Sequence, residues 1–276
     1  MNIHSFQDYL HSAYPSRNSR AAQSYIKAIS ILDELFRKRD VFDLNNQSLS
    51  EIRDPLLLSK IIDYIAEEED KFRREEESIF DLGKSTQTSY PKKRFCTAAI
   101  RRLGEYVDYL CGEEATEIMR DSALSGERLS SELLAKFHIN KQGTEKEILA
   151  KHRIGQNLFR AMLLKLYHKR CCLTDIDIPE VLRASHIIPW SERKATRLNP
   201  ENGLCLSATY DAAFDQHLIS FDEDFRMILS PMLKERYTSE AFKTHFRKFE
   251  GKAITLPSIY APSQEFLETH RSKLVV

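Results

Sequence analysis

Hydrophobic residues recur every three or four positions through most of the first 140 residues, which is typical of amphipathic helices. This spacing predicts one helix from about Arg20 to Lys38 and another within Ser50–Phe80. A third helical stretch is predicted from Glu105 to Leu134. The mixed-charge run at residues 67–77, EEEDKFRREEE, has opposite charges at helical spacing, and we interpret it as a solvated helix face.

The pattern changes after residues 135–144, which we take as a domain boundary near residue 140. A strong amphipathic helix is predicted over Glu145–Arg170. Two short apolar runs follow, Val181–Ile188 and Gly203–Leu206, and each is predicted as a strand. Ser207 is a suitable N-cap for a helix directly after the second strand. The order strand, loop, strand, helix therefore predicts an α+β domain over residues 141–276, with its core at 170–225.

The tail of the chain gives weaker signals. A β-hairpin is predicted from the apolar runs on either side of Asp222–Phe225. The remaining predicted elements are a short strand at Ala253–Leu256 and helices near Ser239–Phe249 and Ser263–Lys273.

Polar residues stand at fixed places in the predicted core. His186 lies near the end of the first apolar run, and Asn202 directly precedes the second. Asp211 and Asp215 are four residues apart on the following helix, so they share a face and can offer oxygens to one hard divalent cation. An imidazole with a pKa of about 6.5 can accept a proton from water at neutral pH. Alone, each residue has an ordinary explanation: a core histidine, a turn, a solvated helix face. Together they favour cleavage of phosphodiesters.

The same residues lie in a longer pattern, which reads ASHIIPW, then NPENGLCL, then DAAFDQHLISF. This pattern resembles the HNH endonucleases, in a branch found among restriction endonucleases. The resemblance implies a ββα-metal fold in which His186 is the general base and Asn202 braces the loop between the strands. It also implies that Asp211, at the third motif position, binds metal, with Asp215 as a second helix ligand.

Two positions depart from the family pattern. Ser185 occupies a place where many members have an aspartate or histidine ligand, so the ion would have fewer protein ligands and more water. Tyr210 stands where close relatives often have histidine, which leaves open whether Asp211 alone holds the third position. With Ser185, Asp211 and Asp215 as the candidate metal ligands, the site is rich in oxygen and favours Mg²⁺ or Mn²⁺ over zinc.

Cysteine usage and hydropathy bear on structure and compartment. The five cysteines are an odd number and form no CxxC pair, so we expect neither a structural zinc nor a disulfide framework. The first twenty residues lack an apolar signal core, and no stretch approaches the roughly 20 apolar residues of a membrane span. We therefore expect a cytoplasmic protein without a membrane partner.

The distribution of charge suggests where nucleic acid would bind. The formal net charge is zero, which argues neither way, but residues 141–276 carry more basic than acidic side chains. In the N-terminal half, one basic stretch also contains Tyr90 and Phe95. A flexible linker entering a helix would have a similar composition. The candidate DNA-binding residues are Lys92, Lys93, Arg94, Arg101 and Arg102, with Arg153 and Arg160 nearer the motif.

These features predict a metal-dependent HNH endonuclease that cuts double-stranded DNA as a restriction-type enzyme. The helical N-terminal domain, residues 1–140, would serve target recognition or assembly. One motif per chain makes a homodimer the economical expectation for cutting both strands. Two alternatives stay open: a non-catalytic DNA-binding or regulatory protein that keeps the finger, and an RNA-directed nuclease of the toxin kind.

Overall fold

The computed structural model describes residues 3, 5–13, 20–44, 47–81, 88–121 and 123–275. The chain divides into two compact units, Met1–Cys111 and Gly112–Val276. This division groups residues 112–140 with the C-terminal unit, whereas the sequence placed the boundary near residue 140. The reason is tertiary packing, because helix α6 (Gly126–Lys136) contacts the loop that joins the two predicted strands. For example, the backbone N–H of Leu198 donates to Ser130 Oγ over 3.1 Å.

The N-terminal unit is built from helices and loops, and its described residues contain no strand. Its helices bury apolar stripes spaced as the sequence indicates, with Leu32, Ile61 and Ile100 almost fully inaccessible to solvent. Asp54 caps the third helix by accepting hydrogen bonds from the N–H groups of Leu56 and Leu57. The elements are α1 (Phe6–Ala13), α2 (Arg20–Arg39), η1 (Leu49–Glu51), α3 (Pro55–Arg73), α4 (Ser89–Lys92) and α5 (Phe95–Asp121), which continues into the second unit.

The mixed-charge run on α3 is not a wholly solvated face, so that interpretation was wrong. Glu68 and Glu69 are buried. The Glu69 carboxylate accepts hydrogen bonds from the N–H groups of Cys96 (3.0 Å) and Thr97 (3.1 Å) and from the Thr97 hydroxyl. These N–H groups belong to the first turn of α5, where a helix has no backbone acceptors of its own. Glu69 therefore caps a helix that begins 26 positions later in the sequence.

Substitution of Glu69 by alanine is expected to destabilise the protein by about 1–3 kcal/mol, because it leaves buried donors of α5 without an acceptor. Chemical denaturation followed by circular dichroism measures this loss. Glu67→Ala is the matched control, since Glu67 lies on the same helix with a side chain 66% exposed and pairs only with Lys71 in the described chain. The control should change the unfolding free energy by less than about 0.5 kcal/mol. Equal losses in both variants would contradict the capping role.

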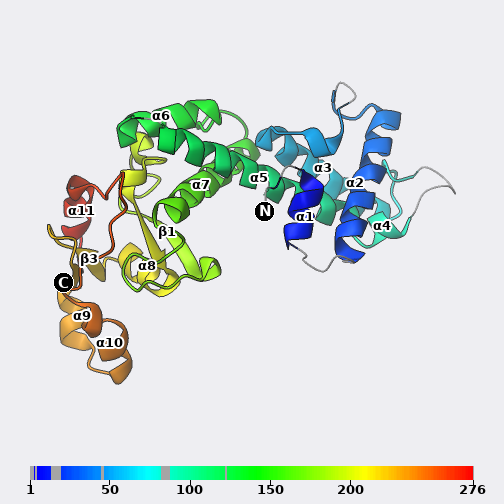
Figure 1. The fold of residues 1–276 in the computed structure, drawn as a ribbon. Coiled ribbons are helices and arrows are strands. Elements are labelled where there is room, and N and C mark those ends of the chain that lie inside the picture. Colours follow the sequence, from blue (N-terminus) through cyan, green and yellow to red (C-terminus); the bar gives the residue numbers. More distant parts are fainter. Residues whose placement is uncertain are drawn as a thin grey trace. The chain divides into compact units, whose positions relative to one another are not determined.

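In the C-terminal unit a two-stranded sheet lies against two helices (Figure 1). Strand β1 (Leu182–His186) pairs antiparallel with β2 (Gly203–Ser207), with His186 opposite Gly203. Helix α7 (Glu145–Leu166) and helix α8 (Ala208–Asp215) both contact these strands. Both predicted strands and the helix after them are therefore confirmed. Ser207 stands at the N-cap position of α8, but its side chain makes no capping hydrogen bond.

The loop between β1 and β2 contains two short 3₁₀ turns, η4 (Lys194–Thr196) and η5 (Pro200–Asn202). A third turn, η3 (Pro179–Val181), leads into β1.

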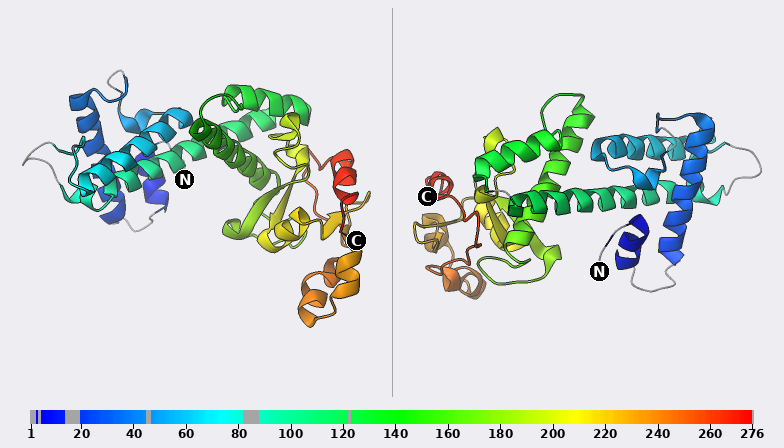
Figure 2. Two further views of the ribbon diagram at one scale, coloured as in Figure 1. Left: turned by 180° about the vertical axis from the view of Figure 1, so that it is seen from behind. Right: turned by 45° about the horizontal axis from the view of Figure 1, so that its top comes forward.

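A second sheet follows α8. Strands β3 (Ile219–Phe221) and β4 (Met227–Leu229) form the predicted hairpin, and helix α11 (Gln264–Arg271) packs against β3 (Figure 2). Ala253–Leu256 is not a strand, since only Ala253 forms an isolated bridge, to Arg226. The predicted helix near residues 239–249 is shorter, α10 (Glu240–His245) followed by η6 (Arg247–Phe249).

The structure also contains a helix that the sequence analysis missed, α9 (Pro231–Arg236). Its signal was present, because Ser230 caps it through the N–H of Leu233 and proline occupies its first turn. The helical stretch predicted at Glu105–Leu134 is divided between α5 and α6. Within the described residues, no helix is both long and apolar enough to cross a membrane.

Candidate active site

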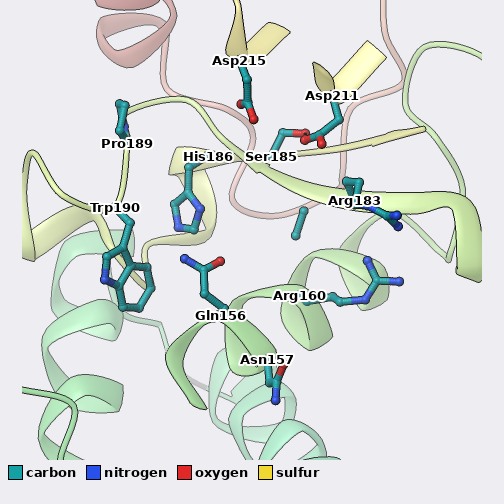
Figure 3. A pocket seen from close by; sticks show the side chains of 11 residues that line it. Gln156, Asn157, Arg160, Arg183, Ser185, His186, Pro189, Trp190, Asp211 and Asp215 are labelled. Atoms are coloured by element: carbon teal, nitrogen blue, oxygen red, sulfur yellow. The ribbon is translucent and has the colours of Figure 1, made fainter. Parts of the chain in front are cut away.

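An open pocket of about 490 Å³ lies where α7, β1 and α8 meet in the C-terminal unit (Figure 3). It brings together five of the residues singled out from the sequence. His186 and Ser185 come from β1, Asp211 and Asp215 from α8, and Arg160 from α7. The pocket is lined by Gln156, Asn157, Arg160, Arg183, Ala184, Ser185, His186, Pro189, Trp190, Asp211 and Asp215.

His186 is held in a fixed orientation at the end of β1. Its ring stacks on Phe159 of α7 with centroids 3.7 Å apart and planes inclined by 14°. Its Nε2 lies 3.0 Å from the carbonyl oxygen of Arg197. A carbonyl oxygen only accepts hydrogen bonds, so Nε2 carries the proton and the lone pair of the neutral ring is on Nδ1. Burial lowers the pKa of His186 to about 4, and the imidazole is therefore neutral at physiological pH.

Asn202 braces the loop that leads away from His186. Its Oδ1 accepts from the N–H of Ile188 (2.8 Å), and its Nδ2 donates to the carbonyls of Ile188 (3.0 Å) and Thr196 (3.1 Å). The side chain is fully buried and does not line the pocket. Asn202, a motif residue beside the expected base His186, therefore does not belong with the catalytic residues, because it cannot touch a substrate held in this pocket.

Asp211 and Asp215 stand one turn apart on α8. Figure 3 shows both carboxyl groups on the same side of the pocket as Ser185 and His186. Ser185 Oγ donates to Asp211 Oδ1 over 2.5 Å, which orients that carboxylate. Burial, together with the charge of Asp211, raises the pKa of Asp215 to about 6. The two acidic side chains therefore repel one another and form no ion pair with a basic side chain of the described chain.

This donor set fits a hard divalent ion. Magnesium is typically held by one or two carboxylates and keeps several waters. Two neighbouring carboxylates open to a polar pocket meet that need, and their mutual repulsion would be relieved by a cation. Within the described residues no group of three or more histidine, cysteine or acidic side chains is arranged to hold a metal. Any ion here would thus depend on water, or on substrate oxygens, for most of its coordination.

Tyr210 lies outside the pocket. It is buried against Phe246 and Phe249, and its hydroxyl donates to the carbonyl oxygen of His245. Tyr210, which stands where similar sequences often have histidine, therefore links α8 to the helical segment at residues 240–249. Of the two neighbouring positions, Asp211 alone faces the pocket.

The predicted DNA-binding residues are dispersed. Arg94 pairs with Asp70, and Arg102 with Glu105 at 2.6 Å. Arg160 is half-buried and donates to the carbonyls of Leu182 and Pro179, each over 2.7 Å. It is the one predicted DNA-binding residue that lines the pocket. The others are exposed but do not line it: Lys92, Lys93, Arg101 and Arg153.

Sequence reasoning missed several residues that line the pocket. Arg183 and Ser185 are two residues apart on β1. Because side chains two residues apart lie on the same face of a strand, the sequence could have placed both on one face. Gln156 and Asn157 lie one turn or less before Arg160 on α7. Trp190 follows the strand end, and its ring lies beneath the guanidinium of Arg197 at 5.3 Å. Trp190 ends the ASHIIPW pattern, but its place in the pocket could not be predicted because the helix against which it packs is over thirty residues earlier.

Gly155 lets Trp190 pack directly against α7. A Cβ atom at this position would lie 2.3 Å from Cη2 of Trp190. We expect Gly155→Ala to displace the indole, at a net cost of about 1–3 kcal/mol despite the better helix propensity of alanine. Because Trp190 is the only tryptophan in the chain, a shift in the wavelength of its emission reports the displacement.

The matched test of this contact is the double variant Gly155→Ala/Trp190→Phe. The smaller phenylalanine ring should relieve the clash, so alanine at position 155 should cost less in that background. If the cost is the same in both backgrounds, the loss does not come from Trp190.

The five cysteines are buried free thiols. Burial raises the pKa of Cys205 to about 12 and that of Cys172 well above its usual value. Such thiols stay protonated at neutral pH and are poor nucleophiles.

Comparison with known proteins bears on the segment that forms the pocket. No curated protein matches the chain. Residues 171–222 match a family model described as HNH endonuclease. This segment contains β1, the braced loop, β2 and α8, and with them His186, Ser185 and both aspartates. Over this segment the chain is therefore similar to HNH endonucleases, a similarity that points to a nuclease acting on nucleic acid.

Proposed function

We propose that the protein is a metal-dependent endonuclease that hydrolyses phosphodiester bonds of double-stranded DNA, as a restriction-type defence enzyme. The observation that carries this proposal is the pocket. There an oriented neutral imidazole stands beside two carboxylates that no basic side chain of the described chain neutralises. A base next to a cation site is the arrangement that hydrolysis of a phosphodiester requires. We propose that β1, β2 and α8 act as a ββα-metal finger.

In the proposed mechanism His186 is the general base. Its Nδ1 accepts a proton from water, and the water oxygen attacks phosphorus. The bond to the 3′ oxygen breaks, which leaves a 5′ phosphate and a 3′ oxygen that takes a proton from solvent to become a hydroxyl, while His186 returns its proton to solvent. The bond from Nε2 to the Arg197 carbonyl fixes the tautomer and becomes stronger as the ring gains a proton. The low pKa makes His186 a weak base, so the reaction depends on a water that is itself acidified.

Asp211 and Asp215 would hold Mg²⁺ or Mn²⁺ in this scheme. When bound, such an ion supplies Lewis acidity and neutralises negative charge on the phosphate oxygens and the leaving group. We propose that Ser185 acts mainly through its hydrogen bond to Asp211, which leaves one oxygen of that carboxylate directed away from the serine. Asn202 is architectural, since it fixes the backbone at Ile188 and Thr196.

The rest of the proposal concerns assembly and context. The sequence carries one HNH-like segment, so cutting both strands at one place would use two copies of the chain, and we propose a homodimer in the cytoplasm. We propose that the N-terminal helical unit contributes to target recognition or assembly, with Lys92, Lys93 and Arg101 as exposed cations able to contact phosphates.

The proposal is tested with a panel of substrates in Mg²⁺ and in Mn²⁺. The panel contains modified and unmodified phage DNA, single-stranded DNA, and folded RNA. Discrete fragments from duplex DNA would support a restriction-type enzyme. Activity confined to folded RNA would replace it with the toxin-type alternative. Tight binding of duplex DNA without cleavage of any substrate would favour a non-catalytic binding protein.

A further inference from the structure

The pocket carries opposite charges toward its two ends. Asp211 and Asp215 lie above His186 in Figure 3, and the guanidinium groups of Arg160 and Arg183 lie together at the end far from Trp190. Neither arginine forms an ion pair with a carboxylate of the described chain. Two adjacent cations are unfavourable in a partly buried site, and the charge of Glu180 offsets their repulsion at Arg160 only in part. Their proximity contributes, after burial, to a lowered pKa of Arg160.

The two arginines are held differently. Arg160 is half-buried and fixed, because Nη1 and Nη2 both donate to backbone carbonyls of the segment that enters β1. Arg183 is exposed, and only its Nη1 is engaged, with the carbonyls of Glu180 (3.1 Å) and Leu182 (2.8 Å). Its Nε and Nη2 have no hydrogen-bond partner in the described chain. Arg183 therefore has an edge open to a ligand, and Arg160 adds a fixed positive charge behind it.

The position of this edge suggests which anion it takes. Arg183 and Ser185 are two residues apart on one face of β1, a separation of roughly 6.5 Å along a strand. This length is comparable to the spacing of neighbouring phosphates in a nucleic acid strand. A phosphate at His186, Ser185 and Asp211 would thus place the next phosphate of the same strand near Arg183.

We infer that Arg183, supported by Arg160, forms a second phosphate subsite that binds the phosphodiester adjacent to the one being cut. This inference rests on the proposed function. It makes the substrate a polynucleotide with at least two consecutive phosphates, rather than a simple diester. A guanidinium also suits this role because it can donate two parallel hydrogen bonds to one phosphate.

DNA binding tests the subsite without requiring catalysis. The dissociation constant of a 20-bp duplex is measured by fluorescence anisotropy in chelator over a series of salt concentrations, for wild type and Arg183→Ala. Loss of one phosphate contact should lower the slope of log Kd against log salt by about 1 and weaken binding about tenfold. Arg128→Ala is the control, since Arg128 is an exposed arginine of the same unit that does not line the pocket. An unchanged slope for Arg183→Ala, or no binding of the duplex by wild type, would overturn the inference.

Cleavage separates this inference from the proposed function. Bis(p-nitrophenyl) phosphate has one phosphodiester and no neighbouring phosphate. Arg183→Ala should lower kcat/KM about tenfold or more on DNA and less than about twofold on this ester. Equal losses on both substrates would overturn the subsite but leave the nuclease intact. If wild type cleaves neither substrate in Mg²⁺ or Mn²⁺, the proposed nuclease function fails, and the salt slope alone decides whether Arg183 binds phosphate.

Discussion

Replacement of His186 by alanine should lower the rate of DNA cleavage by about 10²–10⁴, the usual contribution of a general base. The structural reason is that His186 lines the pocket and its Nε2 is occupied by the Arg197 carbonyl, which leaves Nδ1 as the nitrogen that can accept a proton. Single-turnover cleavage of plasmid DNA at saturating enzyme measures the chemical step without a contribution from binding.

The control for this experiment must keep the ring's structural role. Alanine removes the stack on Phe159 and leaves the Arg197 carbonyl without its donor. His186→Gln retains an N–H group at a similar distance along the side chain but has no basic nitrogen. Both variants should bind duplex DNA. The ring centroid of Trp190 lies 5.7 Å from that of His186, so unchanged tryptophan fluorescence should show that the pocket is preserved. Full activity in His186→Gln would show that His186 is not the base.

The second large effect concerns the aspartates, where activity and stability should move in opposite directions. Asp211→Asn and Asp215→Asn should each abolish metal-dependent cleavage, because an amide oxygen binds a hard cation more weakly than a carboxylate does. Without metal, Asp215→Asn should stabilise the protein at pH 7. It removes a charge that is partly desolvated and is repelled by Asp211.

The sign of this stability change follows from the pKa of Asp215. Its value is raised in the folded protein to about 6 from 3.8. Between these values the folded state holds the proton more tightly, so this group favours folding at low pH, and the benefit is lost as pH rises to about 6. Because the side chain is exposed, solvent screening reduces the effect at neutral pH to about 1 kcal/mol. Asp215→Asn should therefore flatten the dependence of stability on pH between about 4 and 6.

Thermal denaturation with and without 10 mM MgCl₂ checks both parts of this prediction. In chelator, Asp215→Asn should melt above wild type at pH 7 and at the same temperature at pH 4. Magnesium should raise the melting temperature of wild type but not that of either variant, because a ligand that binds only the folded state stabilises it. If Asp215→Asn melts below wild type at pH 7, the charge of Asp215 does not destabilise the folded protein.

The central part of the fold could be predicted from sequence because its signals are local. The apolar run that contains His186, the run after Asn202, and the four-residue spacing of Asp211 and Asp215 each depend on neighbouring residues only. The strand pairing brought these side chains together as expected. The hydrogen bonds of Asn202 likewise agree with a brace for the loop.

Features that arise from distant contacts could not be predicted in this way. Glu69 looks like one charge among many in its run, and its role depends on the start of α5. Residues 112–140 look like a continuation of the helical half, but α6 packs on the β1–β2 loop. Arg183 lies outside the motif pattern, and its place in the pocket follows only from the face of β1 that it shares with Ser185.

Cleavage of supercoiled plasmid by wild type and His186→Gln, side by side, tests the central claim most directly. Each protein is assayed in chelator and again after Mg²⁺ or Mn²⁺ is restored in excess. We expect nicked and linear products only from wild type and only with metal. DNA ligase should reseal the nicked product, because the proposed reaction leaves a 5′ phosphate. Equal cleavage by both proteins, or cleavage by wild type that persists in chelator, would contradict the assignment of His186 as base beside a metal held by Asp211 and Asp215.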